Sequence, residues 1–318
     1  MKMNKKFLVA LMLVMLLVLT ACSTKETTDL DITKKSSNEV IPTMDRAGNP
    51  VVIPEEINTI VSLAPSMTQV IIELGLSDKL IATDTQSPLY AEGISELPQF
   101  DMMAPDIEAL AGLNPDIIFV SGMSSANGDN PYKQLIELGI CVVTIPSSTS
   151  IEGVKEDDLF IADCLKIHEA GVAMNEEMQA IINQIATIGA TIEDKKTVMF
   201  EISSLPYIYS FGSNTFLNEM IEIIGATNVF EDQESWISVT EEAAISENPD
   251  IILTNVNYIE DSVGEILARV GWEEMAAIKN KSVFYIDNGT SSLSNHHIVD
   301  AFKEMAKAIY PEVYADMN

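Results

Sequence analysis

The sequence predicts an α/β protein of two Rossmann-like lobes, each with a central, mostly parallel sheet, joined by one long rigid α-helix. Three observations predict this fold. Short apolar runs suited to buried strands alternate with helical patterns along most of the chain. Helical periodicity then dominates residues 151–189 without a strand signal. Finally, two short motifs of the first half return in the same order in the second half, which indicates a duplicated architecture.

The first half supplies the strands and helices of one lobe. Ser66 is suited to cap a helix that Gly75 ends, since Gly is favoured just after the last helical residue. A second helix stops at Asn114-Pro115, directly before an apolar strand. We expect strands at 50–53, 59–64, 80–83, 116–120 and 141–145, and helices at 65–74, 106–113 and 132–138.

The second half repeats the alternation after the helical region, which has a break near 165–168. The repeated motifs are Asn114-Pro115-Asp116-Ile117-Ile118, which returns from Asn248 to Ile252, and Val70 to Gly75, which resembles Met220 to Gly225. We expect strands at 197–202, 250–254 and 282–286, and helices at 216–224, 241–246, 263–270 and 297–309. The predicted organisation is an N-lobe at 43–150, linking helices at 151–192 and a C-lobe at 193–318.

The N-terminal segment has the pattern of an export signal. Lys2, Lys5 and Lys6 precede an unbroken apolar run from Phe7 to Leu19, followed by small residues, which is the pattern of a signal peptide. Leu19-Thr20-Ala21-Cys22 resembles the cleavage box of bacterial lipoproteins. That resemblance implies removal of residues 1–21 and lipidation of Cys22, including palmitate; two acyl chains suffice for stable anchoring. Residues 22–42 are polar and predict a flexible tether.

Composition excludes several classes of partner. With 18 Lys plus Arg against 48 Asp plus Glu, the net charge is −30, which repels nucleic acid. Arg46 and Arg269 are the two arginines, too few for a pocket that grips strongly anionic ligands. Three His and three Cys exclude a His-rich metal cage and a disulfide-rich scaffold. Cys141 and Cys164 are either a disulfide or two buried free thiols.

Motifs of catalysis and cofactor binding are absent from the sequence. No GxxxxGK[ST], GxGxxG, HExxH, GxSxG or CxxC occurs, so we expect neither an enzyme nor a resident cofactor. His168 is interpreted as a surface or capping residue. His296 and His297 precede the last helix, and the alternatives for them are a helix N-terminus or a loop that contacts ligand. Because adjacent side chains point in different directions, this pair alone predicts no metal chelate.

Three motifs in order resemble the iron-complex and cobalamin class of ABC-transporter substrate-binding proteins. The first runs from Asp45-Arg46-Ala47-Gly48 through Val52-Ile53-Pro54 to Ile60–Thr68. The second is Pro105–Leu110 with Leu113–Asp116, and the third is Phe216–Glu222 with Gly225 and Asn228. The resemblance covers about Met44 to Pro311. It implies the class III substrate-binding fold and capture of a large metal chelate outside the cell, for delivery to a permease dimer with cytoplasmic ATPases.

The resemblance also implies roles for particular residues. One carboxylate on each lobe docks onto the permease in this family; Glu108 and Glu222 match those positions. Ligand contacts lie on loops at strand ends, where Met and aromatic side chains suit a broad apolar chelate. The matching candidates are Ser66, Met67, Met102, Met103, Met123, Tyr207, Tyr209, Trp236, Asn257, His296 and His297.

The chain departs from the family pattern at three places, so its ligand is not copied from a relative. Gln69 stands where Glu is usual, Phe100-Asp101 replaces a Gly pair, and Asn295-His296-His297 replaces a turn rich in Pro and Arg. A corrinoid such as cobalamin and a ferric hydroxamate siderophore both suit a pocket poor in Arg, and haem is a third alternative. From other classes, an enzyme or metallochaperone on a similar scaffold, or a Zn or Mn uptake protein, stays open. We expect a monomer.

Overall fold

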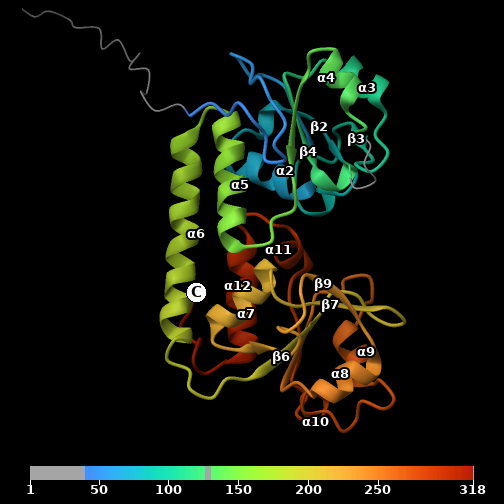
Figure 1. Cartoon of the computed structure of the whole chain (residues 1–318), viewed down its shortest axis with the longest axis vertical. Coiled ribbons are helices and arrows are strands. Elements are labelled where there is room, and N and C mark those ends of the chain that lie inside the picture. The colour runs from blue at the N-terminus through green and yellow to red at the C-terminus, as the bar shows by residue number, and fades with distance from the viewer. Residues whose placement is uncertain (1–39, 126–129, 318) are drawn as a thin grey trace, which may run out of the picture. The chain divides into compact units, whose positions relative to one another are not determined.

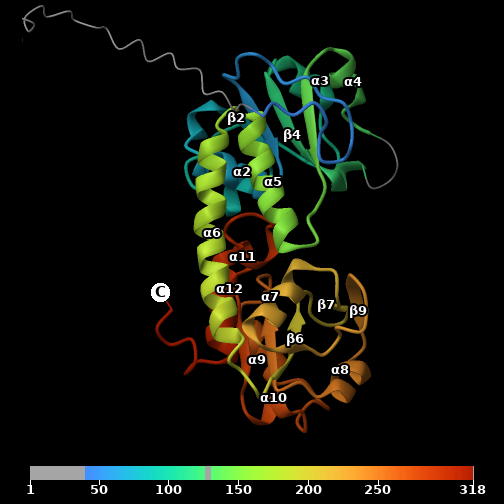
Figure 2. The same ribbon diagram turned by 60° about the vertical axis from the view of Figure 1, so that its left-hand side comes forward.

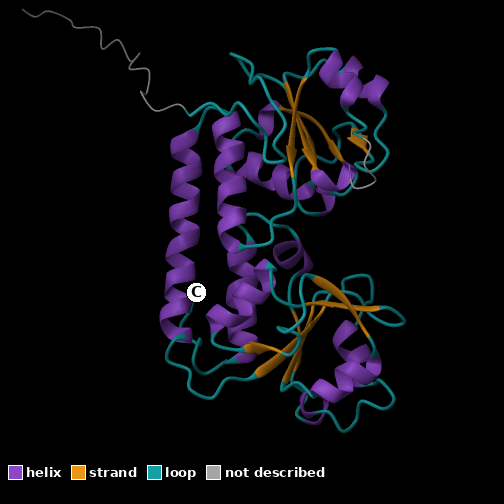
Figure 3. Cartoon of the chain, viewed as in Figure 1, coloured by secondary structure: helices purple, strands orange, loops and turns teal. Residues whose placement is uncertain are grey.

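The computed structural model describes residues 40–125 and 130–317, so the leader, Cys22 and most of the tether lie outside the described residues. The described residues belong to one compact unit. It holds two α/β lobes and a pair of linking helices (Figure 1, Figure 3). Within this part of the chain no helix has the length and apolar character needed to cross a membrane.

The N-lobe is built on a five-stranded parallel sheet with the order β3-β2-β1-β4-β5. Every residue of β4 is buried, and alternate residues enter different cores: Ile117 and Phe119 one, Ile118 and Val120 the other. A sheet covered on both faces has this pattern. The elements are β1 (Ile60–Leu63), α2 (Pro65–Glu73), η1 (Ser77–Lys79), β2 (Leu80–Asp84), η2 (Ser87–Leu89), β3 (Gln99–Phe100), α3 (Ile107–Gly112), β4 (Ile117–Ser121), η3 (Gly122–Ser125), α4 (Lys133–Glu137) and β5 (Cys141–Ile145).

Two helices link the lobes, α5 (Ile151–Cys164) and α6 (His168–Gly189). They lie side by side in both views (Figure 1, Figure 2). The Ser150 hydroxyl caps α5 by accepting a hydrogen bond from the Gly153 backbone amide at 3.0 Å. Lys166 lies between α5 and α6, and its φ of 60° separates the two helices. α5 contacts α2 of the N-lobe, whereas α6 contacts α7 and α12 of the C-lobe. The link is therefore the predicted long helix, α6, supported by a shorter partner.

The C-lobe has a four-stranded parallel sheet, order β11-β10-β6-β8, and a separate antiparallel pair, β7 and β9. α7 and α12 place their buried faces against the sheet and α6 in one core. The elements are β6 (Thr197–Glu201), β7 (Ile208–Phe211), α7 (Phe216–Ile224), β8 (Thr227–Asn228), β9 (Trp236–Val239), α8 (Glu241–Glu247), β10 (Ile251–Thr254), α9 (Ser262–Leu267), α10 (Ala276–Lys279), β11 (Val283–Tyr285), α11 (Asn288–Ser292) and α12 (Ile298–Ile309).

The repeated Asn-Pro-Asp motif has the same structural role in both lobes. Asn114 and Asn248 each adopt a φ of 47°, a left-handed conformation that Asn tolerates and that ends the preceding helix. Asp116 then accepts from the backbone and hydroxyl of Thr59, and Asp250 accepts likewise from Thr197. Each carboxylate thus ties the start of its strand to the start of the neighbouring strand.

Some of the predicted secondary structure is wrong. α2 begins at Pro65 with Ala64 as its N-cap, so Ser66 does not cap this helix. Residues 50–53 form no strand; Pro50 makes only an isolated bridge with Met44. The antiparallel pair β7 and β9 was not predicted. Of the two alternatives for the cysteines, the structure shows free thiols, since Cys141 and Cys164 are both buried and unbridged.

Candidate ligand cleft and its surroundings

A cavity of about 700 Å³ lies between the lobes. The N-lobe contributes Gln69 and residues 88–95, which follow β2. The C-lobe contributes Asn257, Tyr285 and residues 287–290, which follow β10 and β11. These segments come after the carboxyl ends of parallel strands, where ligands of open α/β sheets bind. Of the predicted ligand residues, Asn257 lies in this cavity.

Hydrogen bonds cross between the lobes beside this cavity. The Asn295 amide of the C-lobe donates to the Ser66 carbonyl at 3.1 Å and to Gln69 Oε1 at 2.7 Å. The Gln69 amide in turn donates to the Tyr90 carbonyl at 3.0 Å, and the Tyr90 hydroxyl donates to Asn288 Oδ1 at 3.1 Å. Gln69 and Asn295, two of the departures from the family pattern, are therefore partners. A Glu at position 69 would lack the amide that donates to Tyr90.

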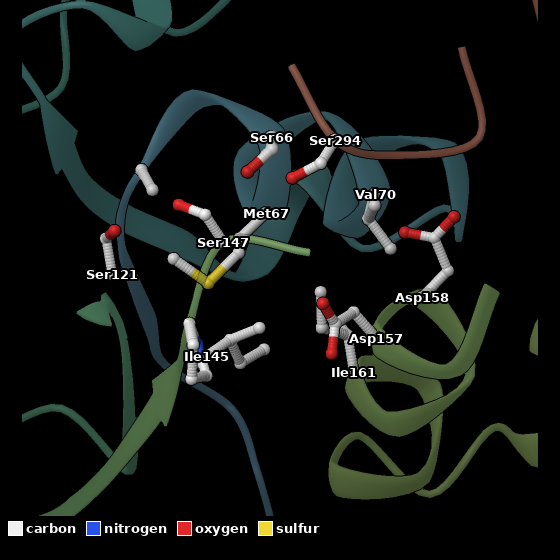
Figure 4. Close-up of a pocket in the computed structure, with 12 residues that line it drawn as sticks. Ser66, Met67, Val70, Ser121, Ile145, Ser147, Asp157, Asp158, Ile161 and Ser294 are labelled. Carbon is white, nitrogen blue, oxygen red and sulfur yellow. The ribbon is translucent and has the colours of Figure 1, made fainter. Parts of the chain in front are cut away.

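A second, much smaller cavity of about 30 Å³ lies where α2, α5 and the loop before α12 meet (Figure 4). Ser66 of α2 and Ser294 of that loop approach each other there, and Met67 lies below them. The space suits one or two water molecules and is too small for a chelate. On the α5 side, burial and the neighbouring Asp157 raise the pKa of Asp158 well above its usual value. Ser66 and Met67 thus border a polar pocket beside the interlobe cavity.

Four exposed aromatic side chains on the C-lobe form what we call the aromatic face: Tyr207, Tyr209, Trp236 and Tyr258, with 73, 44, 47 and 64% of their surface exposed. Tyr209 and Trp236 come from β7 and β9, which lie at the end of the C-lobe nearest the N-lobe (Figure 1). The Trp236 ring packs edge-on against buried Phe211, with centroids 5.9 Å apart. The Tyr258 hydroxyl donates or accepts at the Ser203 hydroxyl and accepts from the Ser204 amide. These contacts hold the Trp236 ring and the Tyr258 hydroxyl in place.

The sequence did not predict three residues of these two surfaces: Tyr258 on the aromatic face, and Tyr90 and Gln69 at the interlobe cavity. Tyr258 directly follows Asn257, so its place after strand β10 was the signal that could have found it. Tyr90 gave no such signal, because its partner Asn288 is 198 positions away. Gln69 stood out as a departure from the family pattern, but its partner Asn295 is 226 positions away.

Of the four predicted methionines of the N-lobe, Met67 lies on α2, Met102 and Met103 lie in the loop after β3, and Met123 lies on the short helix η3. Met103 and Met123 are about half exposed, at 51 and 54%. The Met102 carbonyl accepts from the Tyr132 hydroxyl at 3.3 Å, which fixes the loop after β3. Met123 lines a cavity next to Gly122 and Pro146 that is separate from the one between the lobes.

Both arginines of the chain are engaged in ion pairs with carboxylates of their own lobe or of α5. Arg269 is almost completely buried and binds Glu201 through two bonds of 2.7 and 2.8 Å, with Glu265 as a further partner at 2.6 Å. Arg46 binds Asp157 at 2.6 Å and Glu156 at 2.8 Å. Neither guanidinium is free for an anionic ligand. The prediction of a cleft without arginine forks therefore agrees with the geometry.

The remaining predicted residues lie away from the interlobe cavity. Glu108 on α3 and Glu222 on α7 are exposed, and Glu222 accepts from the Asn218 amide at 2.6 Å. His296 and His297 border a cavity against α6, on which Glu73 of α2 also lies. The structure therefore brings the predicted ligand residues to several places rather than to one pocket. Cys22 lies outside the described residues.

Comparison with known proteins agrees with this architecture. Residues 60–290 match the family described as periplasmic binding protein. The chain is 30% identical over 290 residues to the uncharacterized ABC transporter substrate-binding lipoprotein YvrC of Bacillus subtilis, covering 90% of this chain and 91% of that protein. It is 24% identical over 281 residues to a cobalamin-binding protein of Halobacterium salinarum, covering 84 and 73%.

A solved structure shows the same fold. It is described as a possible iron-binding (periplasmic solute-binding) protein from Staphylococcus epidermidis, with a TM-score of 0.71 and 27% identity over 80% of this chain and 100% of that one. The family match spans well over half of the chain, and the resemblance inferred from the sequence motifs is confirmed. The chain therefore belongs to the periplasmic binding protein family and is a substrate-binding component of the ABC-importer class.

Proposed function

We propose that this protein captures a near-neutral metal chelate with a broad apolar face, a corrinoid in first place, and delivers it to an ABC permease. The observation that carries the proposal is the aromatic face. Its four exposed rings belong to β7, β9 and the loops that follow β6 and β10, and the Tyr258 hydroxyl is already hydrogen bonded. Such a surface favours a flat macrocycle over a small ion.

Charge and size favour the same ligand class. Since both arginines are paired with carboxylates, a multiply anionic catecholate would meet no free guanidinium. A cavity of about 700 Å³ lies within the usual range for small-molecule sites, so a ligand as large as a corrinoid would also cover the surface beside it. A ferric hydroxamate fits nearly as well as a corrinoid, and the name of the Halobacterium relative supports the latter. Haem is the alternative ligand, although its negatively charged propionates would require cationic side chains in the site.

The proposal also includes the predicted oligomeric state, the lipid anchor and the permease contact. The mature chain would be a monomer anchored through Cys22 outside the cytoplasm, and Glu108 and Glu222 would dock onto the permease. Binding and release need no covalent chemistry, so we propose no catalytic role. The alternative from another class, an enzyme or metallochaperone on the same scaffold, would require a reactive group in the cleft.

A titration tests the ligand directly. The soluble unit from residue 39 onward is titrated with cyanocobalamin, a ferric hydroxamate, haemin and molybdate while visible absorbance and tryptophan emission are followed. Trp236 lies on the aromatic face and Trp272 is fully buried, so quenching reports mainly on Trp236. We expect submicromolar binding of one chelate. Binding of molybdate alone, or of none of the four, would contradict the proposed ligand class.

A pair of variants tests the aromatic face. Trp236→Ala is expected to weaken chelate binding at least about tenfold, because a ring contact and its buried area are lost. Val270→Ala removes another exposed apolar side chain, in the turn after α9, and serves as the control with unchanged affinity. Unchanged affinity in Trp236→Ala would remove the aromatic face from the binding site.

A further inference from the structure

A cavity of about 430 Å³ lies against the linking helix α6, away from the aromatic face. The end of α2 contributes Glu73, and the start of α12 with the residues before it contributes His296, His297 and Asp300. α6 forms the remaining wall with Ala170, Ala173, Met174, Glu177, Met178 and Ile181. Two of the three histidines of the chain thus meet carboxylates at one place.

The side chains are arranged as metal ligands are. Glu73, His296 and His297 each offer one ligand atom, and these atoms lie within 4.8 Å of one another. The two imidazole rings have centroids 4.0 Å apart and planes at 39°, so they extend in the same direction. The expectation that adjacent histidines would diverge is therefore wrong here, because the backbone turns just before α12 begins.

The buried ring of His296 lacks hydrogen-bond partners within the described part of the chain. Both of its ring nitrogens are buried, and neither has a hydrogen-bond partner among residues 40–125 and 130–317. A buried donor or acceptor that is left unpaired destabilises the folded protein. A neutral imidazole has one N–H donor and one nitrogen with a free lone pair. A metal ion would use that lone pair.

A carboxylate supports the second histidine. Asp300 Oδ2 lies 3.7 Å from His297 Nδ1. Metal-bound histidines usually donate their other ring N–H to a carboxylate, which sets the tautomer and leaves Nε2 for the metal. A small closure would bring Asp300 into that role. Glu73 is exposed, so its carboxylate is free to approach the rings.

We propose that Glu73, His296 and His297 bind a divalent transition metal of the Zn²⁺ type. Two imidazoles and one carboxylate form a three-ligand set that Zn²⁺ accepts, with a fourth position open to water. Ligand nitrogens on tetrahedral zinc lie about 3.3 Å apart, so the side chains need to close by up to about 1.5 Å. Because Glu73 belongs to the N-lobe and the histidines to the C-lobe, the metal would link the lobes on the α6 side.

Metal binding by the compact unit from residue 39 onward is measured by calorimetry with Zn²⁺ and by visible absorption with Co²⁺. We expect one metal per chain and the strong visible bands of tetrahedral Co²⁺. His297→Ala and Glu73→Gln each weaken binding by at least about tenfold. His168→Ala and Glu176→Gln are the matched controls, since His168 pairs with Asp163 and Glu176 is exposed on α6. Both controls should bind like the native chain.

Thermal unfolding separates loss of a ligand from loss of the fold. Each variant is melted without metal and with excess Zn²⁺: a folded variant keeps the metal-free melting temperature but loses the metal-induced rise. No stoichiometric binding by the native chain, or equal weakening in His168→Ala, would overturn the proposal. Trp236→Ala must leave Zn²⁺ binding unchanged, which keeps this site distinct from the aromatic face.

Discussion

The two cysteines show how burial controls chemistry at single residues. Cys141 opens the edge strand β5, and Cys164 ends α5 in the same core. Burial raises the pKa of Cys141 to about 11 and raises that of Cys164 further. Because the thiolate is the reactive form, both thiols are suppressed at neutral pH.

This predicts slow labelling by a thiol reagent of the native compact unit from residue 39 onward, which does not contain Cys22. At pH 8 a thiol with a pKa near 11 is about one part in a thousand thiolate, and its rate should rise about tenfold per pH unit while the protein stays folded. The reagent 5,5′-dithiobis(2-nitrobenzoic acid) follows the reaction by absorbance, and guanidinium-unfolded protein serves as the fast reference. Native protein that reacts as fast as unfolded protein would refute the argument, and Cys141→Ser identifies which thiol reacts first.

At the scale of elements, two glycines allow α6 and α7 to meet at their carboxyl ends. A Cβ on Gly189 would lie 2.1 Å from the Ile223 carbonyl oxygen, and Gly225 ends α7 with a φ of 91°. Real Cβ atoms do not approach a backbone oxygen so closely. The contact therefore holds the C-lobe against the linking helix only while residue 189 lacks a side chain.

Gly189→Ala is expected to destabilise the protein by about 1–3 kcal/mol, because the two helix ends must separate. Gly112→Ala is the matched control: that glycine ends α3 with open space around it, so the change should be neutral or stabilise by up to about 1 kcal/mol. Urea unfolding of both variants measures the difference. Equal midpoints for the two variants would mean that the helix ends separate at no cost.

Elements with strong local signals could be predicted from the sequence, and the rest depend on distant contacts. The stop signals at Asn114 and Asn248 and the capping Gly225 predicted helix ends to within a residue or two. β7 and β9 are too short and too mixed in polarity to stand out alone; each becomes a strand because the other pairs with it. The run at 50–53 had strand character but meets no sheet edge.

At the scale of the whole molecule, the sequence separated lobes and link but not the contacts between them. Gln69 and Asn295 are 226 positions apart, and nothing local shows that two unusual residues satisfy one another. The same holds for Glu73 and the paired histidines. Motif matches predicted the class of protein, which is confirmed, whereas the docking role of Glu108 and Glu222 stays a prediction. The interlobe cavity could be found only in the three-dimensional structure.

The docking assignment predicts a separation of transport from binding. Glu108→Ala combined with Glu222→Ala should abolish uptake in cells while leaving chelate affinity in solution unchanged, because both side chains are exposed and lie outside the interlobe cavity. Glu137→Ala with Glu247→Ala removes two other exposed helix carboxylates, one per lobe, and controls for charge. A parallel fall in affinity and uptake would refute docking, and normal uptake would show that other residues make the contact.

α6 also has a mechanical consequence as a lever. Its 22 residues span about 33 Å, so a tilt of about 10° at one end displaces the other by about 6 Å. Small rotations at the base of the helix are thus amplified into an opening comparable to the thickness of a planar ligand. A force applied at the far ends of the lobes would therefore rotate them about the contact between Gly189 and α7.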